Sequence, residues 1–157
     1  MSAVLSRRQS GQICMSTERI VVQRSIAEKF SRMLVEASEE VFGKDSPAAV
    51  LVTAAAVEKN KKLVSDAVSK GADIAFGDPN VTNLSTNGMR PVIVQNVTKD
   101  MDIYAAESFG PTVSLIAVES DDDAVALAND TEYGLTSAVF TGNLFRGLNV
   151  AKKIESG

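Results

Sequence analysis

Short β-branched segments alternate with amphipathic helical segments along most of this chain. The strand-like segments are residues 18–24, 73–76, 91–94 and 112–118. Strands that are separated by helices are joined by crossover connections, which favour parallel pairing. The alternation therefore predicts an α/β fold, in which helices flank a largely parallel sheet.

Four helical segments accompany these strands. In the first, Ser25 is the expected N-cap and Gly43 the stop, and one apolar stripe comprises Ile26, Phe30, Met33, Leu34, Ala37 and Val41. The second ends at Gly71, and its apolar face comprises Val57, Val64, Ala67 and Val68. Ser120 and the three aspartates after it predict the start of the third helix.

The C-terminal part predicts one more strand and one more helix. Residues 137–141 (SAVFT) have the β-branched and aromatic character of a strand. Asn143 is the expected cap of a final helix, and one side of that helix comprises Leu144, Leu148, Ala151 and Ile154. A chain of 157 residues has the size of one domain.

Charge and composition exclude several classes of function. The net charge of -4 argues against nucleic acid or an anionic membrane as a partner, and no apolar run approaches the roughly 20 residues that span a bilayer. One cysteine permits no internal disulfide, so we expect the cytoplasm. The chain has no histidine, which excludes Ser-His-Asp and Cys-His catalysis and removes the commonest metal ligand. We therefore expect no metal site.

The single cysteine, Cys14, has two interpretations. Free cysteine often behaves as a small buried hydrophobe. Here Gly11 precedes it, and Gln12, Ser16 and Thr17 supply polar groups nearby, which argues for a reactive thiol, but these residues alone leave both interpretations open.

Three segments, in the same order, resemble the aldehyde dehydrogenase superfamily, and especially its vanillin- and salicylaldehyde-type members. They are residues 11–19 (GQICMSTER), 107–111 (ESFGP) and 128–141 (ANDTEYGLTSAVFT). The resemblance implies that Cys14 is the nucleophile that attacks the aldehyde carbonyl. It also implies that Glu107 holds the ribose hydroxyls on the nicotinamide side of NAD(P), and that Phe109 lies beside the nicotinamide. Without the resemblance, Glu107 is a surface carboxylate before a turn and Phe109 is equally suited to core packing.

The chain differs from the family pattern at one position and lacks one of the family's expected sequence motifs. Ala106 stands where many members carry another acid, and no strand–GxGxxG–helix unit occurs. We expect residues 1–17 to form an N-terminal arm and the start of the cysteine loop, and residues 18–157 to form a single α/β domain that resembles the family's catalytic domain. The cofactor-binding domain and the general-base glutamate of the family would precede this piece, as in a natural truncation or an engineered fragment.

Three functions are compatible with these residues. The first is cofactor-independent chemistry (isomerisation, cyclisation, condensation or hydrolysis) on a small carbonyl or thioester compound, which uses Cys14, a carboxylate such as Glu107, or both; no cofactor is expected for the isolated chain. The second is NAD(P)-dependent aldehyde oxidation that needs the missing segments from another chain. The third is a non-catalytic assembly module. A piece without its usual neighbours should expose apolar surface, so we expect a homo-oligomer.

Overall fold

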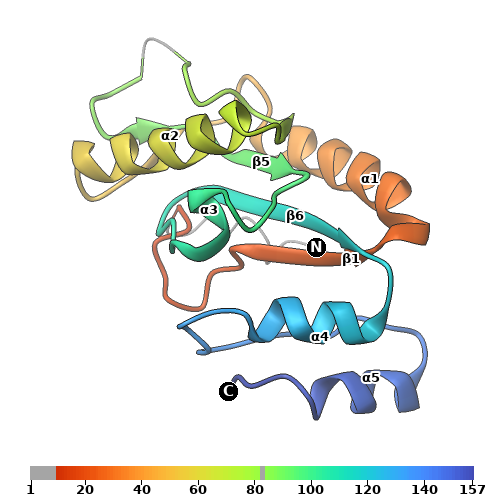
Figure 1. The fold of residues 1–157 in the computed structure, drawn as a ribbon. Coiled ribbons are helices and arrows are strands. Elements are labelled where there is room, and N and C mark those ends of the chain that lie inside the picture. Colours follow the sequence, from red (N-terminus) through yellow and green to blue (C-terminus); the bar gives the residue numbers. More distant parts are fainter. Residues whose placement is uncertain (1–9, 82–83) are drawn as a thin grey trace.

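A four-stranded sheet forms the centre of the computed structural model, which describes residues 10–81 and 84–157. The strands lie in the order β1 (Arg19–Gln23), β6 (Thr112–Val118), β5 (Val92–Gln95) and β3 (Asp73–Phe76) (Figure 1). Both β1 and β5 run parallel to β6, while β3 pairs antiparallel with β5 at one edge. The predicted α/β fold with a largely parallel sheet is therefore confirmed.

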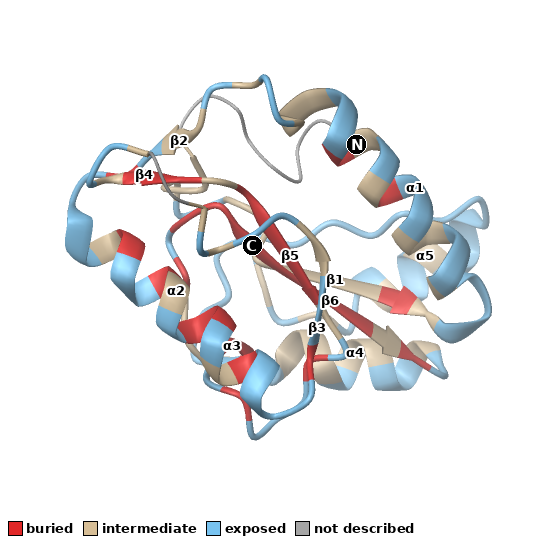
Figure 2. Ribbon diagram, turned by 90° about the horizontal axis from the view of Figure 1, so that it is seen from above, coloured by how far each residue is buried: buried red, intermediate tan, exposed pale blue. Residues whose placement is uncertain are grey.

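Helices cover both faces of this sheet (Figure 2). Side chains alternate along β5, so Val92 and Val94 pack on one face with α2 (Ala54–Ser69) and α3 (Asp102–Ala105). Ile93 points to the other face, where it packs with Leu34 of α1 (Arg24–Phe42). A separate two-stranded sheet pairs β2 (Ala49–Val50) with β4 (Gly88–Met89).

Helix α1 begins earlier than predicted, and its inward face only partly matches the predicted stripe. Gln23 is its N-cap, makes no capping hydrogen bond, and leaves Ser25 inside the helix. Ile26 and Met33, both predicted to face the core, are 53% and 50% exposed. Leu34 is buried as predicted, and the inward face also contains Ser38. Ser38 can be buried because its hydroxyl donates to the carbonyl of Leu34 at 2.7 Å.

Helix α2 follows the prediction more closely. Thr53 caps it, since its side chain accepts from the backbone N–H of Ala56. Val57, Val64 and Ala67 are buried, and only Val68, at 44% exposed, turns away from the core. The helix ends where Gly71 takes a φ of 101°, a conformation that glycine adopts without steric cost.

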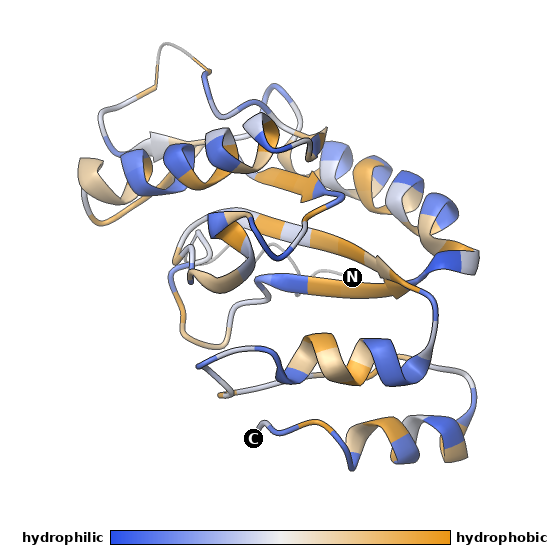
Figure 3. Cartoon of the chain, in the orientation of Figure 1, coloured by the Kyte–Doolittle hydropathy of each residue, from blue (hydrophilic) through white to orange (hydrophobic). Residues whose placement is uncertain are grey.

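The C-terminal region lies beside β1, at the edge of the central sheet (Figure 1). It contains α4 (Asp121–Asn129) and α5 (Leu144–Ala151). The strand predicted at residues 137–141 is wrong: these residues lie in an exposed irregular segment, because no strand of the described chain pairs with them. The predicted final helix is present, but the apolar side named for it is exposed at Leu144, Leu148 and Ala151, and Ile154 lies beyond its end. Figure 3 shows apolar stretches on both helices.

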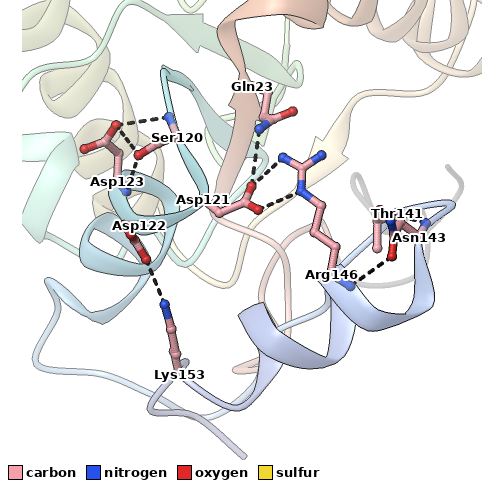
Figure 4. A network of polar contacts seen from close by, with 9 residues as sticks. All are labelled: Gln23, Ser120, Asp121, Asp122, Asp123, Thr141, Asn143, Arg146 and Lys153. Atoms are coloured by element: carbon pink, nitrogen blue, oxygen red, sulfur yellow. Dashed lines mark hydrogen bonds and ion pairs between the residues drawn. The ribbon is translucent and has the colours of Figure 1, made fainter.

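Ion pairs hold α5 against α4 (Figure 4). The guanidinium of Arg146 donates two hydrogen bonds to the carboxylate of Asp121, each of 2.6 Å, and Lys153 pairs with Asp122 at 2.8 Å. The Arg146 guanidinium holds the pKa of Asp121 below its usual range. Ser120 and Asp123 form the capping box that begins α4, as the sequence predicts.

Residues 1–9, most of the predicted N-terminal arm, lie outside the described part of the chain. Within the described residues, no helix combines the length and the apolar character that crossing a bilayer requires.

Candidate functional site

The loop before β1 presents the only cysteine to solvent. Gly11 takes a φ of 75°, and the backbone N–H of Ser16 donates to the carbonyl of Ile13 at 2.8 Å, which closes a turn around Cys14. Cys14 is a free, exposed thiol. Its backbone N–H makes no hydrogen bond within the described residues. The thiol is therefore exposed, and the N–H has no partner among the described residues.

The side chain of Gln12 fixes this loop to the segment after β2. Its amide Nε2 donates to the carbonyl of Val50 at 3.1 Å, and its Oε1 accepts from the N–H of Val52 at 2.8 Å. The side-chain amide therefore pairs with one backbone carbonyl and one backbone N–H, as the backbone of a neighbouring strand would. Gln12 thus attaches the loop that carries Cys14 to the segment at the end of β2.

Glu18 connects the cysteine loop to the turn that carries the second predicted motif. Its Oε2 accepts from the N–H of Ser108 at 2.6 Å, and its Oε1 accepts from the N–H of Phe109 at 2.8 Å. The hydroxyl of Ser108 lies a further 3.1 Å from Oε1. Hydrogen bonds to a carboxylate are shorter and stronger than neutral ones, so this contact joins the two segments firmly.

The same turn places Glu107 and Phe109 in different environments. Phe109 has a φ of 49°, a left-handed conformation that costs a residue with a Cβ about 1–2 kcal/mol, and it is 39% exposed. Glu107 is half-buried, and its carboxylate makes no hydrogen bond or ion pair with any described residue. The turn therefore offers an unpaired carboxylate and a partly exposed aromatic ring two positions apart.

Two glycines allow the loop and the turn to pack closely. A Cβ on Gly11 would overlap the carbonyl group of Gly110, and a Cβ on Gly110 would overlap the side-chain amide of Asn60. Only glycine fits at either position. The cysteine loop, the turn and helix α2 are thus stacked in direct contact.

Asn60 supports the turn from below and is fully buried. Its Nδ2 donates to the carbonyl of Ser108 at 3.1 Å and to that of Ala56 at 3.0 Å. Its Oδ1 accepts from the hydroxyl of Thr112 at 2.7 Å. Every polar atom of this side chain is used, as buried amides require.

A charged cluster around Asp130, a residue of the third motif, fixes the start of β1. Asp130 accepts hydrogen bonds from Tyr104 at 2.6 Å and from Lys99 at 2.5 Å, and Arg19 donates to its backbone carbonyl. Lys99 lowers the pKa of Asp130, while burial raises the pKa of the Tyr104 phenol. Asn129 bonds the backbone at Lys153 and Glu155. In this chain the third motif therefore joins α4 to its neighbours.

The structure brings the first two predicted motifs together around Cys14, joins the third to the first through Arg19, and adds residues that the sequence did not single out. The loop of Cys14 contacts the turn of Glu107 and Phe109 through Glu18 and Gly11. Asn60 had a sequence signal, because it is a polar residue in the apolar stripe between Val57 and Val64. Ser108 had none. A groove of about 420 Å³ between α1 and β3 includes none of these residues, and its lining comprises Ser31, Arg32, Val35, Glu36, Ile74, Ala75 and Gln95.

No group of three or more cysteine, aspartate and glutamate side chains in residues 10–81 and 84–157 is arranged as metal ligands would be.

Fold and site together define an α/β protein whose exposed thiol lies on a loop that contacts an acidic and aromatic turn. Residues 3–157 match the model of the aldehyde dehydrogenase family. The chain belongs to this family, and the resemblance seen in the sequence is confirmed.

Individual members of this family are similar to the chain in sequence and in structure. It is 37% identical over 152 residues to a vanillin dehydrogenase of Pseudomonas fluorescens, a match that covers 94% of this chain and 31% of the relative. The structure of a salicylaldehyde dehydrogenase from Pseudomonas putida G7, complexed with salicylaldehyde, matches with a TM-score of 0.85 at 36% identity, over 94% of this chain and 31% of that one. A succinic semialdehyde dehydrogenase from Streptococcus pyogenes in complex with NADP+ matches with a TM-score of 0.84 at 29% identity, over 94% and 33%. The chain thus spans about a third of the length of these proteins.

Proposed function

We propose that this chain carries the nucleophilic thiol and the nicotinamide-side wall of an NAD(P)-dependent aldehyde dehydrogenase site. The observation that carries the proposal is the exposed Cys14 on a loop bonded to the turn of Glu107 and Phe109. Relatives that act on aromatic aldehydes support an aldehyde of that class as substrate.

The chemistry begins with the thiol. The thiolate of Cys14 attacks the carbonyl carbon, a C–S bond forms, and the π electrons move onto the carbonyl oxygen. The unbonded backbone N–H of Cys14 can donate to that oxyanion. A turn held by Gln12 keeps this N–H fixed, so little reorganisation accompanies the attack.

The residues of the turn fit the nicotinamide end of a dinucleotide. The carboxylate of Glu107 has no partner in the described chain and can accept hydrogen bonds from vicinal ribose hydroxyls. Phe109, exposed over 39% of its surface, offers a flat apolar face to a planar ring. NAD(P), when bound, supplies the hydride acceptor for aldehyde oxidation. With no histidine in the chain, proton transfer falls to carboxylates, lysines or water.

Alkylation of Cys14 tests the first step. Iodoacetamide labels only one site because the chain has one cysteine, so intact mass gives the rate directly. We expect benzaldehyde or salicylaldehyde to slow labelling at concentrations at which it leaves the labelling of N-acetylcysteine unchanged, because the loop stabilises the adduct. Cys14→Ser is the control that takes up no label. Protection equal to that of N-acetylcysteine would refute a dedicated aldehyde site.

Nucleotide binding tests the second element. We expect NAD+ or NADP+ to bind the intact chain in titration calorimetry, and Glu107→Gln to weaken that binding about tenfold, since hydrogen bonds to a charged group contribute about 1.5–3 kcal/mol. Glu132→Gln, a change of the same type at an exposed residue, should leave it unaffected. Equal affinity of wild type and Glu107→Gln would remove Glu107 from the site.

Cofactor-independent carbonyl or thioester chemistry, the first expectation from the sequence, stays a prediction. What favours it is that the thiol and N–H of Cys14 are accessible without a nucleotide. Turnover of a thioester by the wild type but not by folded Cys14→Ser, with no change in absorbance at 340 nm, would make it the better description.

A further inference from the structure

We propose that Glu18 is a positioning residue that holds Phe109 in its left-handed conformation and so fixes the face that the ring presents. This inference rests on the proposed function for its consequence at the nicotinamide, but its structural part stands on the contacts of Glu18 alone. Glu18 does not need to touch a substrate or a cofactor to act in this way.

The contacts of the Glu18 carboxylate are unusual in their targets. Its two oxygens accept from two successive backbone N–H groups, those of Ser108 at 2.6 Å and Phe109 at 2.8 Å. Both N–H vectors can converge on one carboxylate only when the backbone is locally curved, as in anion-binding turns. The φ of 49° at Phe109 belongs to such a curved backbone.

The opposite side of the turn is fixed independently of Glu18. Asn60 donates to the carbonyl of Ser108 at 3.1 Å, and its amide leaves no room for a Cβ at Gly110. Glu18 itself is anchored because its carbonyl accepts from the N–H of Ser114 at 2.8 Å, where β1 begins to pair with β6. The carboxylate therefore closes a turn whose two flanks cannot move apart.

The consequence is specific to residue 109. A phenylalanine released from the carboxylate should leave the left-handed region for the conformations that its Cβ prefers, and its ring would turn with the backbone. Glycine has no such preference. Replacement of Phe109 by glycine should therefore let the backbone of the turn keep its conformation without Glu18, although both amides still lose their acceptor, and a general loss of stability does not produce this behaviour.

Amide hydrogen exchange of the full chain, followed by NMR, tests the positioning. In the wild type we expect the N–H groups of Ser108 and Phe109 to be protected, and Glu18→Ala to accelerate exchange of both at least tenfold. Glu18→Gln retains one acceptor oxygen, so it should release at least one of the two amides. Glu119→Ala, which removes a carboxylate beyond the end of β6, should change neither. In the Phe109→Gly background both amides still lose their acceptor, but Glu18→Ala should change the Cα chemical shifts of Ser108 and Gly110 less than half as much as it does with phenylalanine.

Two results would overturn the proposal. One is protection of both amides in a folded Glu18→Ala or Glu18→Gln variant at the wild-type level. The other is an equal change in the Cα chemical shifts of Ser108 and Gly110 with phenylalanine and with glycine at position 109. Titration with NAD+ and NADP+ distinguishes the positioning role of Glu18 from the proposed function. If Glu18→Ala weakens nucleotide binding about tenfold, the positioning role and the dehydrogenase site are both supported. If the wild type binds neither nucleotide but shows the expected exchange pattern, the positioning role is retained and the dehydrogenase site is rejected.

Discussion

Removal of the Asn60 side chain should destabilise the protein more than almost any other single change in the site. Asn60 is fully buried and makes three hydrogen bonds. In Asn60→Ala the carbonyl of Ser108 and the hydroxyl of Thr112 lose this partner, and both residues are at most 3% exposed. Each buried group left unsatisfied costs about 1–3 kcal/mol. We therefore expect a loss of about 3–5 kcal/mol in the free energy of unfolding, a large part of the roughly 5–15 kcal/mol of a typical domain.

A double-mutant cycle separates this mechanism from a simple loss of volume. Thr112→Val removes the hydroxyl that Asn60 accepts from, so the double variant Asn60→Ala, Thr112→Val has one orphaned group fewer. We expect the two changes to be less than additive by about 1–2 kcal/mol. Thr136→Val, at an exposed position outside the network, is the control that should be additive.

Urea unfolding followed by circular dichroism at 222 nm measures the wild type, the three single variants and the two double variants with Asn60→Ala under one condition. A loss below about 1 kcal/mol in Asn60→Ala, or strict additivity with Thr112→Val, would contradict the reasoning, because either result means that the buried polar groups find other partners. The slopes of the transitions must agree for the comparison to hold.

Three further changes test other parts of the structure. Gly11→Ala should lower the free energy of unfolding by at least about 2 kcal/mol in a urea titration, because a φ of 75° and the overlap with Gly110 both oppose a Cβ. Gly142 has open space around it, so Gly142→Ala should change the free energy of unfolding by less than about 0.5 kcal/mol. Asp121→Asn should speed proteolysis of residues 131–143. Because Arg146 lowers the pKa of Asp121, the wild-type ion pair contributes at pH values above the unfolded pKa of about 3.9 and is lost as the pH falls through the folded pKa, so only the wild type should gain protease sensitivity on acidification. Phe145→Asp, at a side chain 79% exposed, should weaken the predicted self-association in light scattering, while Lys152→Asp should not; a monomeric wild type at micromolar concentration would contradict the homo-oligomer.

The sequence predicts the central layers well because local pattern and burial agree there. Residues 92–94 are a continuous apolar run and residues 112–118 are mostly apolar, as expected of strands buried on both faces, and they lie in β5 and β6. Residues 137–141 have the same local character but no neighbouring strand in the described chain. A β-prone segment becomes a strand only when another strand satisfies its backbone, and periodicity does not reveal whether that partner exists.

Helix α1 shows a second limit of pattern reading. Its 19 residues contain apolar side chains on more than one stripe, so both Met33 and Leu34 fit an inward face. Only the start of the helix at Arg24, directly after β1, decides which of them meets the sheet. Because Ser38 is polar, the true face was also partly hidden from any count of hydrophobic residues.

Site prediction depended on motifs and succeeded only for residues inside them. Cys14, Glu107 and Phe109 were named from short segments, whereas the bond between Glu18 and the turn joins residues 90 positions apart. Long-range polar contacts of this kind have no periodic signal. A buried asparagine in an apolar stripe, such as Asn60, is the exception, since its burial requires partners that can be sought.

The loop that carries Cys14 and helix α5 are held in place by contacts of different strength. Gln12, Glu18 and Asn60 satisfy the cysteine loop and the turn from within this chain, so the geometry around Cys14 does not depend on a ligand. Helix α5, in contrast, is held to α4 by exposed ion pairs, while Leu144 and Phe145 face solvent. Surface pairs stabilise weakly, and their strength falls with salt. Thiol reactivity toward aldehydes should therefore survive conditions, such as 1 M salt, that loosen the C-terminal helix. If labelling of Cys14 and protease sensitivity of α5 changed together under those conditions, the cysteine loop would not be an independently ordered element.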